Sequence, residues 1–120
     1  MNLDHLAIVV ADQDRSRHFY ETYFGFGQGP PSVYEDGTLI IRNSHGFALA
    51  LHPTGTLPLQ HEFSHFGFGV ANPDEVRAIR KKIESAGLNV VEVAEETKYV
   101  SFKFLDPDGY KVEVSWEDVN

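Results

Sequence analysis

The two halves of this sequence resemble each other. A segment that begins at Asp4 is similar to one that begins at Ser64, and an offset of 60 residues aligns His5 with His65. Further aligned pairs are Val10 with Val70, Ala11 with Ala71, Asp14 with Asp74, and Arg17 with Arg77. Agreement of His, Ala, Asp and Arg in one register favours a gene duplication over a chance similarity of two amphipathic segments.

Later parts of the two halves match as well. The segment GFALALHP, from Gly46, aligns with GYKVEVSW, from Gly109, and this alignment places Ala50 opposite Glu113. The offset is 63 residues here, so the second half carries a small insertion. Each half is therefore expected to build the same substructure.

Chain length limits what the two copies can form. With 120 residues, the chain is long enough for one domain with a hydrophobic core and too short for two ordinary domains. We therefore expect a single domain over residues 1–120 made of two modules, 1–52 and 62–117. Residues 53–61, which contain two prolines and a glycine, would join them.

The two modules share one expected order of secondary structure. Alternating apolar residues predict strands over residues 3–10 and 63–70. A helix follows each strand, with Asp12 and Asn72 as N-caps, and three shorter strands complete each module. Glycine is expected to end each helix, at Gly25 and Gly87. The pattern predicts an α+β fold of two tandem βαβββ modules.

Composition excludes several functional classes. The chain has 18 acidic and 10 basic residues, a net charge of −8, which disfavours binding to nucleic acid or to anionic membranes. It has no cysteine, which excludes disulfides and thiolate chemistry. No segment approaches the roughly 20 apolar residues of a membrane-spanning helix, and the first apolar run lacks the basic flank of a signal peptide. We expect a cytoplasmic protein with a small-molecule partner.

Alternation along the strands sorts the side chains onto two faces. Bulky apolar residues such as Ile8 and Phe102 fall on one face, which we expect to form the core under the helices. The opposite face carries small or polar side chains: His5, Ala7, Val9, His65, Gly67, Gly69, Ser101, Lys103 and Glu113. We expect this face to be concave and to bind a ligand.

Two histidines and one glutamate on this face suit a divalent metal ion. Two neutral imidazoles and a carboxylate can occupy one face of an octahedron and leave positions for substrate or water. Such a set fits Fe, Mn, Ni or Zn. A lone strand histidine such as His5 is more often a satisfied structural residue, but the repeat makes it equivalent to His65, which favours a ligand.

The strongest resemblance to a known family lies in four segments of the chain: DHLAIVVAD, HFYETYFGF, SHFGFGVAN and FLDPDGYKVEV. With these segments the sequence resembles the vicinal oxygen chelate superfamily of glyoxalases, fosfomycin-resistance enzymes, extradiol dioxygenases and bleomycin-resistance proteins. The resemblance covers almost the whole chain and implies a glyoxalase-like fold, in which a curved mixed sheet forms a cup with the helices on its outer face. It also implies one divalent ion per site, held by His5, His65 and Glu113, and a homodimer.

The sequence departs from the enzymes of this family at two positions. Glyoxalase I carries a second carboxylate where this chain has Ala50, and fosfomycin-resistance enzymes carry a threonine where it has Ala7. His52 shares a strand face with Ala50 and either substitutes in part for that carboxylate or lies at the rim. For an anionic substrate, the candidate cations are Lys103 and Arg42.

We expect a metal-dependent enzyme whose ion binds two neighbouring oxygens of a small substrate, with lyase, isomerase, transferase or dioxygenase chemistry. The candidate catalytic residues are Lys103, Tyr99 and His52, and the candidate substrate contacts are Ala7, Val9, Ala50, Gly67, Gly69, Ser101 and Lys103. The alternatives are a non-catalytic protein that binds a small molecule or antibiotic, and an accessory domain without a ligand. Whether the modules pair within one chain or across a dimer stays open.

Overall fold

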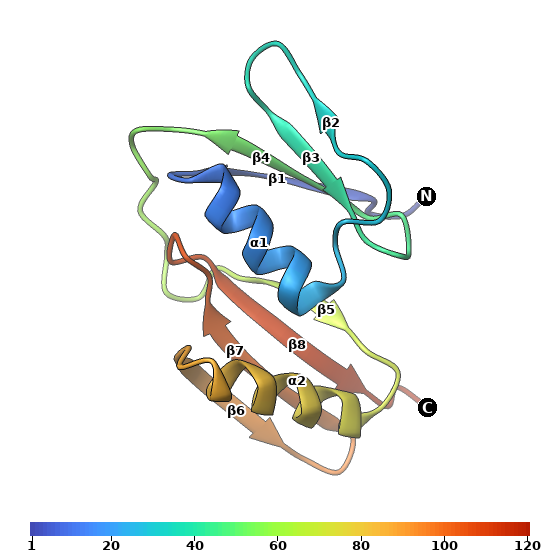
Figure 1. Ribbon diagram of the computed structural model, residues 1–120. Helices are drawn as coiled ribbons and strands as arrows, with labels where there is room; N and C mark the ends of the chain where they lie inside the picture. Colours follow the sequence, from blue (N-terminus) through green and yellow to red (C-terminus); the bar gives the residue numbers. More distant parts are fainter. The chain divides into compact units, whose positions relative to one another are not determined.

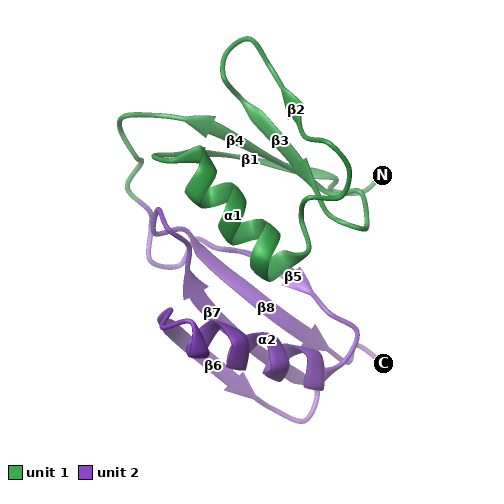
Figure 2. Ribbon diagram, viewed as in Figure 1, with its two compact units in different colours: residues 1–59 green, residues 60–120 purple.

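A computed structural model describes residues 1–120, and the chain separates into two compact units, residues 1–59 and 60–120 (Figure 2). The elements of unit 1 are β1 (His5–Val10), α1 (Gln13–Phe24), β2 (Ser32–Val33), β3 (Leu39–Arg42) and β4 (Ala48–Pro53). The elements of unit 2 are β5 (Phe66–Gly69), α2 (Pro73–Ser85), β6 (Val90–Glu95), β7 (Tyr99–Leu105) and β8 (Lys111–Glu117).

The two sheets have the same topology (Figure 1). Their strand orders are β1-β4-β3-β2 and β5-β8-β7-β6. In each, the first strand pairs in parallel with the last strand of its unit, and the other pairings are antiparallel. The expected α+β architecture of two βαβββ copies with mixed sheets is confirmed. The closure of both sheets into one cup stays a prediction.

The helices begin and end where the sequence indicates. Asp12 caps α1 by accepting a hydrogen bond from the backbone N–H of Arg15 (3.0 Å), and Asn72 caps α2 by accepting one from Glu75 (2.9 Å). Gly25 ends α1 in the left-handed conformation, with φ of 67°. In α2 the cap itself is Ala86, and the left-handed glycine, Gly87, follows it.

The bulky face of each sheet lies under its helix. Fully buried side chains there include Val10, Tyr20, Leu49 and Leu51 in unit 1, and Val76, Ile83, Phe102, Phe104, Val112 and Val114 in unit 2. The other face holds the smaller and more polar side chains, as the alternation predicts. No helix of the chain combines the length and apolar character needed to cross a lipid bilayer.

The strands expected over residues 3–10 and 63–70 are both shorter in the structure, where they span His5–Val10 and Phe66–Gly69. The second is shorter because a turn in which Ser64 N donates to the carbonyl of His61 (3.0 Å) precedes it. In β6 the register with β7 shifts between Val90 and Glu92, and Glu92 lies opposite Lys103 in the register that continues to Glu95.

Candidate functional site

One row of residues crosses all four strands of the unit 2 sheet. Gly67 on β5 pairs with Glu113 on β8, Glu113 pairs with Lys103 on β7, and Lys103 pairs with Glu92 on β6. His65 directly precedes β5. Because paired residues share a face, this row brings together three of the expected site residues and a glutamate that the sequence analysis did not single out.

Glu113 lies at the centre of this cluster. The residue is only 8% exposed, which is exceptional for a carboxylate on a sheet face. Its Oε1 accepts a hydrogen bond from the hydroxyl of Tyr99. Its Oε2 lies 3.2 Å from Nε2 of His65 and 3.8 Å from Nζ of Lys103. The buried carboxylate of Glu113 is therefore contacted by two side chains of β7 and by the imidazole that precedes β5.

The imidazole of His65 is held by its other nitrogen. Nδ1 lies 2.8 Å from the backbone carbonyl of Phe63, and because a carbonyl only accepts, Nδ1 carries the proton. The lone pair of a neutral ring is then on Nε2, which faces the Glu113 carboxylate. Two atoms that both carry lone pairs repel each other at 3.2 Å, unless Nε2 is protonated or a metal ion binds both atoms.

The separation of these two atoms fits a shared metal ion. When two metal–ligand bonds of about 2.1 Å meet at a right angle, the two ligand atoms lie about 3 Å apart. An Nδ1–H donated to a backbone carbonyl is also the arrangement that fixes the tautomer of a metal-binding histidine. His65 and Glu113 therefore have the chemistry and the spacing of two ligands of one ion.

Tyr99 is a neutral donor to this cluster. Burial, followed by its hydrogen bond to the Glu113 carboxylate, raises the pKa of its phenol above the ordinary value. The hydroxyl therefore keeps its proton at neutral pH and donates a hydrogen bond to Oε1. The neighbouring expected contact, Ser101, is 5% exposed on the same strand.

The two lysines of the sheet are both paired with carboxylates. Nζ of Lys103 lies 3.8 Å from both Glu92 and Glu113, and Nζ of Lys111 lies 3.1 Å from Glu92. The hydrogen bond from Lys111 is the largest of the contacts that lower the pKa of Glu92. Glu92 is thus ionised and offsets the positive charge that an incoming anion would otherwise meet.

The glycine at the start of the row leaves space for Glu113. A Cβ at Gly67 would lie 3.1 Å from the Glu113 carbonyl oxygen and 3.2 Å from its Cβ. Any larger side chain would press on the strand that carries the carboxylate. By contrast, Gly69 faces open space.

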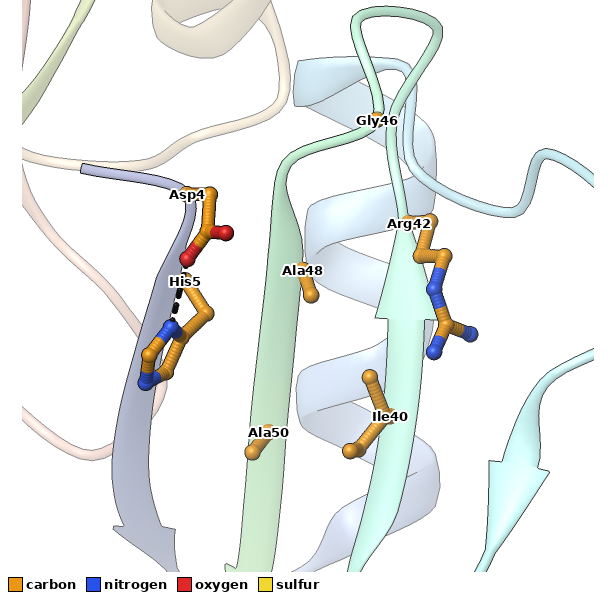
Figure 3. A pocket seen from close by; sticks show the side chains of 7 residues that line it. All are labelled: Asp4, His5, Ile40, Arg42, Gly46, Ala48 and Ala50. Carbon is orange, nitrogen blue, oxygen red and sulfur yellow. Dashed lines mark hydrogen bonds and ion pairs between the residues drawn. The ribbon is translucent and has the colours of Figure 1, made fainter. Parts of the chain in front are cut away.

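Unit 1 contributes the other expected ligand, His5. Its ring is exposed, and Nδ1 lies 2.7 Å from the carboxylate of Asp4, which leaves Nε2 available (Figure 3). A carboxylate beside the imidazole is the second arrangement that orients a metal-binding histidine. Asp4 is adjacent to His5 in the sequence, but no pattern in the sequence indicates this role for it.

His52 lies two residues beyond Ala50 on β4. Its Nδ1 is 2.8 Å from the hydroxyl of Thr38 and 3.9 Å from a carboxylate oxygen of Asp36. The side chain is 44% exposed. These contacts tie His52 to the β2–β3 turn, and the nearby Ala50 has no polar atom to contribute.

The open face of the unit 1 sheet also contains a hollow of about 350 Å³ (Figure 3). Its lining residues are Asp4, His5, Ile40, Arg42, Gly46, Ala48 and Ala50. Within each unit taken by itself, no three His, Asp or Glu side chains form a group that can hold a metal ion.

Comparison with known proteins agrees with this architecture. The model of the Glyoxalase/Bleomycin resistance protein/Dioxygenase superfamily matches residues 2–114. The glutathione transferase FosA of Serratia marcescens is 28% identical over 117 residues, which cover 94% of this chain and 79% of the relative. The metallothiol transferase FosB of Lysinibacillus sphaericus is 28% identical over 120 residues, or 93% of this chain and 79% of the relative.

Solved structures give the fold. A fosfomycin resistance protein, FosX, from Listeria monocytogenes, complexed with Mn(II) and dihydroxypropylphosphonic acid, aligns with a TM-score of 0.82 and 15% sequence identity. The alignment covers 98% of this chain and 93% of that one. The expected glyoxalase-like fold is confirmed.

Proposed function

Because the chain belongs to the Glyoxalase/Bleomycin resistance protein/Dioxygenase superfamily, we propose that it is an enzyme that binds a small substrate through a divalent metal ion. The ligands of this ion are His5, His65 and Glu113. The observation that carries the proposal is the pair formed by His65 Nε2 and Glu113 Oε2, two metal-binding atoms 3.2 Å apart. His5, oriented by Asp4, supplies the third ligand.

His5, His65 and Glu113 would hold the ion, which when bound would supply Lewis-acid chemistry toward two neighbouring oxygens of the substrate. Around it, Tyr99 holds Glu113 in place through Oε1. Lys103 lies 3.8 Å from the same carboxylate and is placed to contact a substrate oxygen. Ala7, Val9, Ala50, Gly67 and Gly69 leave room for the substrate, and Ser101 offers a hydroxyl beside it.

The ion is one of Fe, Mn, Ni or Zn. Two similar proteins support a metal ion: one is named a metallothiol transferase, and the FosX structure contains Mn(II). His52 would act from the rim of the substrate site, because its Nδ1 already forms a hydrogen bond with the hydroxyl of Thr38. A homodimer in which His5 of one copy meets His65 and Glu113 of another would bring the three ligands together.

Addition of a thiol to an activated small molecule is the first reaction to test. Two relatives are named as transferases, one of glutathione and one a metallothiol transferase. The purified chain, loaded in turn with each of the four metals, is incubated with fosfomycin and glutathione, and product is followed by mass spectrometry. We expect metal-dependent product formation that EDTA abolishes. Binding of fosfomycin without any product would instead support the non-catalytic binding protein.

Tyr99→Phe tests the role of the phenol as a positioning group. Removing the hydroxyl takes away the donor that orients Glu113, and loss of such an outer partner typically costs 10- to 100-fold in metal affinity. We expect Mn(II) to bind about tenfold more weakly by isothermal titration calorimetry. The matched control is Tyr34→Phe, because Tyr34 is exposed in unit 1. Equal affinity in Tyr99→Phe and the wild type would exclude this role.

A further inference from the structure

The hollow on the unit 1 sheet contains features that metal binding does not require. It lies beside His5 and extends over β4 to Arg42 on β3 (Figure 3). Its register is regular: Ala48 pairs with His5 on one side and with Arg42 on the other. The next row has Ala50 between Ala7 and Ile40.

Small side chains on the middle strand create this space. Ala48 and Ala50 contribute only a methyl group each, whereas Ile40 and Arg42 stand beside them on β3 (Figure 3). Gly46, in the turn before β4, closes one end without a side chain. The result is a trough with an imidazole along one side and a guanidinium along the other.

Arg42 differs from the other cations on the strands. Lys103 and Lys111 each form an ion pair with a carboxylate. Arg42 forms none: its Nη1 donates to the neutral hydroxyl of Ser32 at 3.1 Å. A guanidinium has five N–H donors, so most of its donors and its full charge remain available to a ligand.

The backbone of Arg42 is held firmly while its side chain is half-buried. Its carbonyl accepts hydrogen bonds from the backbone N–H groups of Gly27 and Gln28, both at 3.0 Å. The one carboxylate that lines the hollow belongs to Asp4, and it is engaged with Nδ1 of His5. A fixed guanidinium at the edge of a partly apolar trough is a receptor for an oxyanion.

We propose that this hollow binds the anionic group of the substrate, a phosphonate, phosphate or carboxylate, through Arg42. This inference rests on the proposed function, because the other end of the same substrate would bind with its two oxygens at the proposed metal site beside His5. His5 and Arg42 are separated by one strand, which sets their backbones about 10 Å apart. The substrate is therefore a short organic acid whose anion and metal-binding oxygens lie at opposite ends.

The test uses inorganic phosphate and acetate as probes on the full, ¹⁵N-labelled chain in EDTA, so that no metal contributes to binding. We expect phosphate to shift the amide signals of Gly46, Ala48 and Ala50 in a saturable way. Arg42→Gln should weaken that binding about tenfold. Saturation by acetate as well would indicate a general oxyanion site, whereas saturation by phosphate alone would identify a phosphate or phosphonate site.

Two further variants complete the experiment. Ala48→Leu fills the trough without changing Arg42 and should weaken phosphate binding to a similar degree, which keeps the test decisive if Arg42→Gln folds poorly. Arg17→Gln is the matched control, because Arg17 is already paired with Glu21 on α1; its affinity should equal that of the wild type. Equal affinity in Arg42→Gln and the wild type, or shifts spread over other surfaces, would overturn the proposal.

The outcome is separable from that of the proposed function. A chain that binds no divalent ion but binds phosphate at Arg42 would refute the metal enzyme and retain this site. A chain that binds a metal through Glu113 but shows no phosphate shifts at Ala48 would do the reverse.

Discussion

Glu113→Gln is expected to remove divalent metal binding almost completely. The change keeps the size of the side chain and an oxygen to accept from Tyr99, but it removes the negative charge that faces His65. An amide is a much poorer ligand for a divalent ion than a carboxylate. The loss should exceed the roughly 10- to 100-fold cost of removing an outer partner, as measured by calorimetric titration of Mn(II).

Glu117→Gln is the matched control for this prediction. Glu117 lies on the same strand and is exposed, opposite Tyr99 in the register. Its replacement should leave the affinity for Mn(II) unchanged. If both variants bound the ion as tightly as the wild type, Glu113 would not be a ligand, and its contacts with Tyr99, His65 and Lys103 would be structural.

Phe102→Ala should produce the largest loss of stability. Phe102 is fully buried on β7, which lies between β6 and β8, and its ring centroid lies 5.7 Å from that of Phe104. Truncation of a buried phenylalanine typically costs about 3–5 kcal/mol, because it loses burial and leaves a cavity. We expect a decrease of this size in the free energy of unfolding, measured by urea denaturation and circular dichroism.

Leu105→Ala, on the same strand, is the control for Phe102→Ala. Leu105 is 40% exposed, so its truncation leaves no closed cavity. It should cost less than about 1 kcal/mol. A similar loss for both variants would mean that burial of Phe102 is not what stabilises the sheet.

The sequence repeat was sufficient to predict the order of elements in both units. Local signals gave the helix starts, since Asp12 and Asn72 each accept a hydrogen bond from an N–H in the first turn. Period-two alternation placed Glu113 and Lys103 on one face, and the register of β7 with β8 agrees. These features depend on residues close together in the chain, which is why a single sequence suffices for them.

The charge balance of the unit 2 face was not predictable in the same way. Glu92 pairs with Lys103 in the same register as Val93 with Phe102 and Ala94 with Ser101, so the pairing depends on how the two strands align. Alternation along β6 groups Glu92 with Ala94 on one face, but it does not define which residues of β7 lie opposite them. The consequence is functional, since the ion pairs with Glu92 reduce the capacity of Lys103 to bind an anion and leave Arg42 as the unpaired cation of the strands.

The hollow in unit 1 could not be predicted from the sequence either. From the sequence, Ala50 is only the position of a missing carboxylate, and Arg42 is one of two candidate cations. Only the pairing of Ala48 with both His5 and Arg42 shows that small residues on the middle strand separate an imidazole from a guanidinium. Pairing between strands joins distant parts of the chain, and neither composition nor alternation defines it.

The metal content of the chain tests the central claim most directly. The protein is purified without a histidine-rich tag, reconstituted with Fe, Mn, Ni or Zn, and measured by inductively coupled plasma mass spectrometry beside His5→Ala and the control His18→Ala. We predict about one ion per chain for the wild type and His18→Ala, and loss of the ion in His5→Ala. No bound ion with any of the four metals, or full retention in His5→Ala, would contradict a site built from His5, His65 and Glu113.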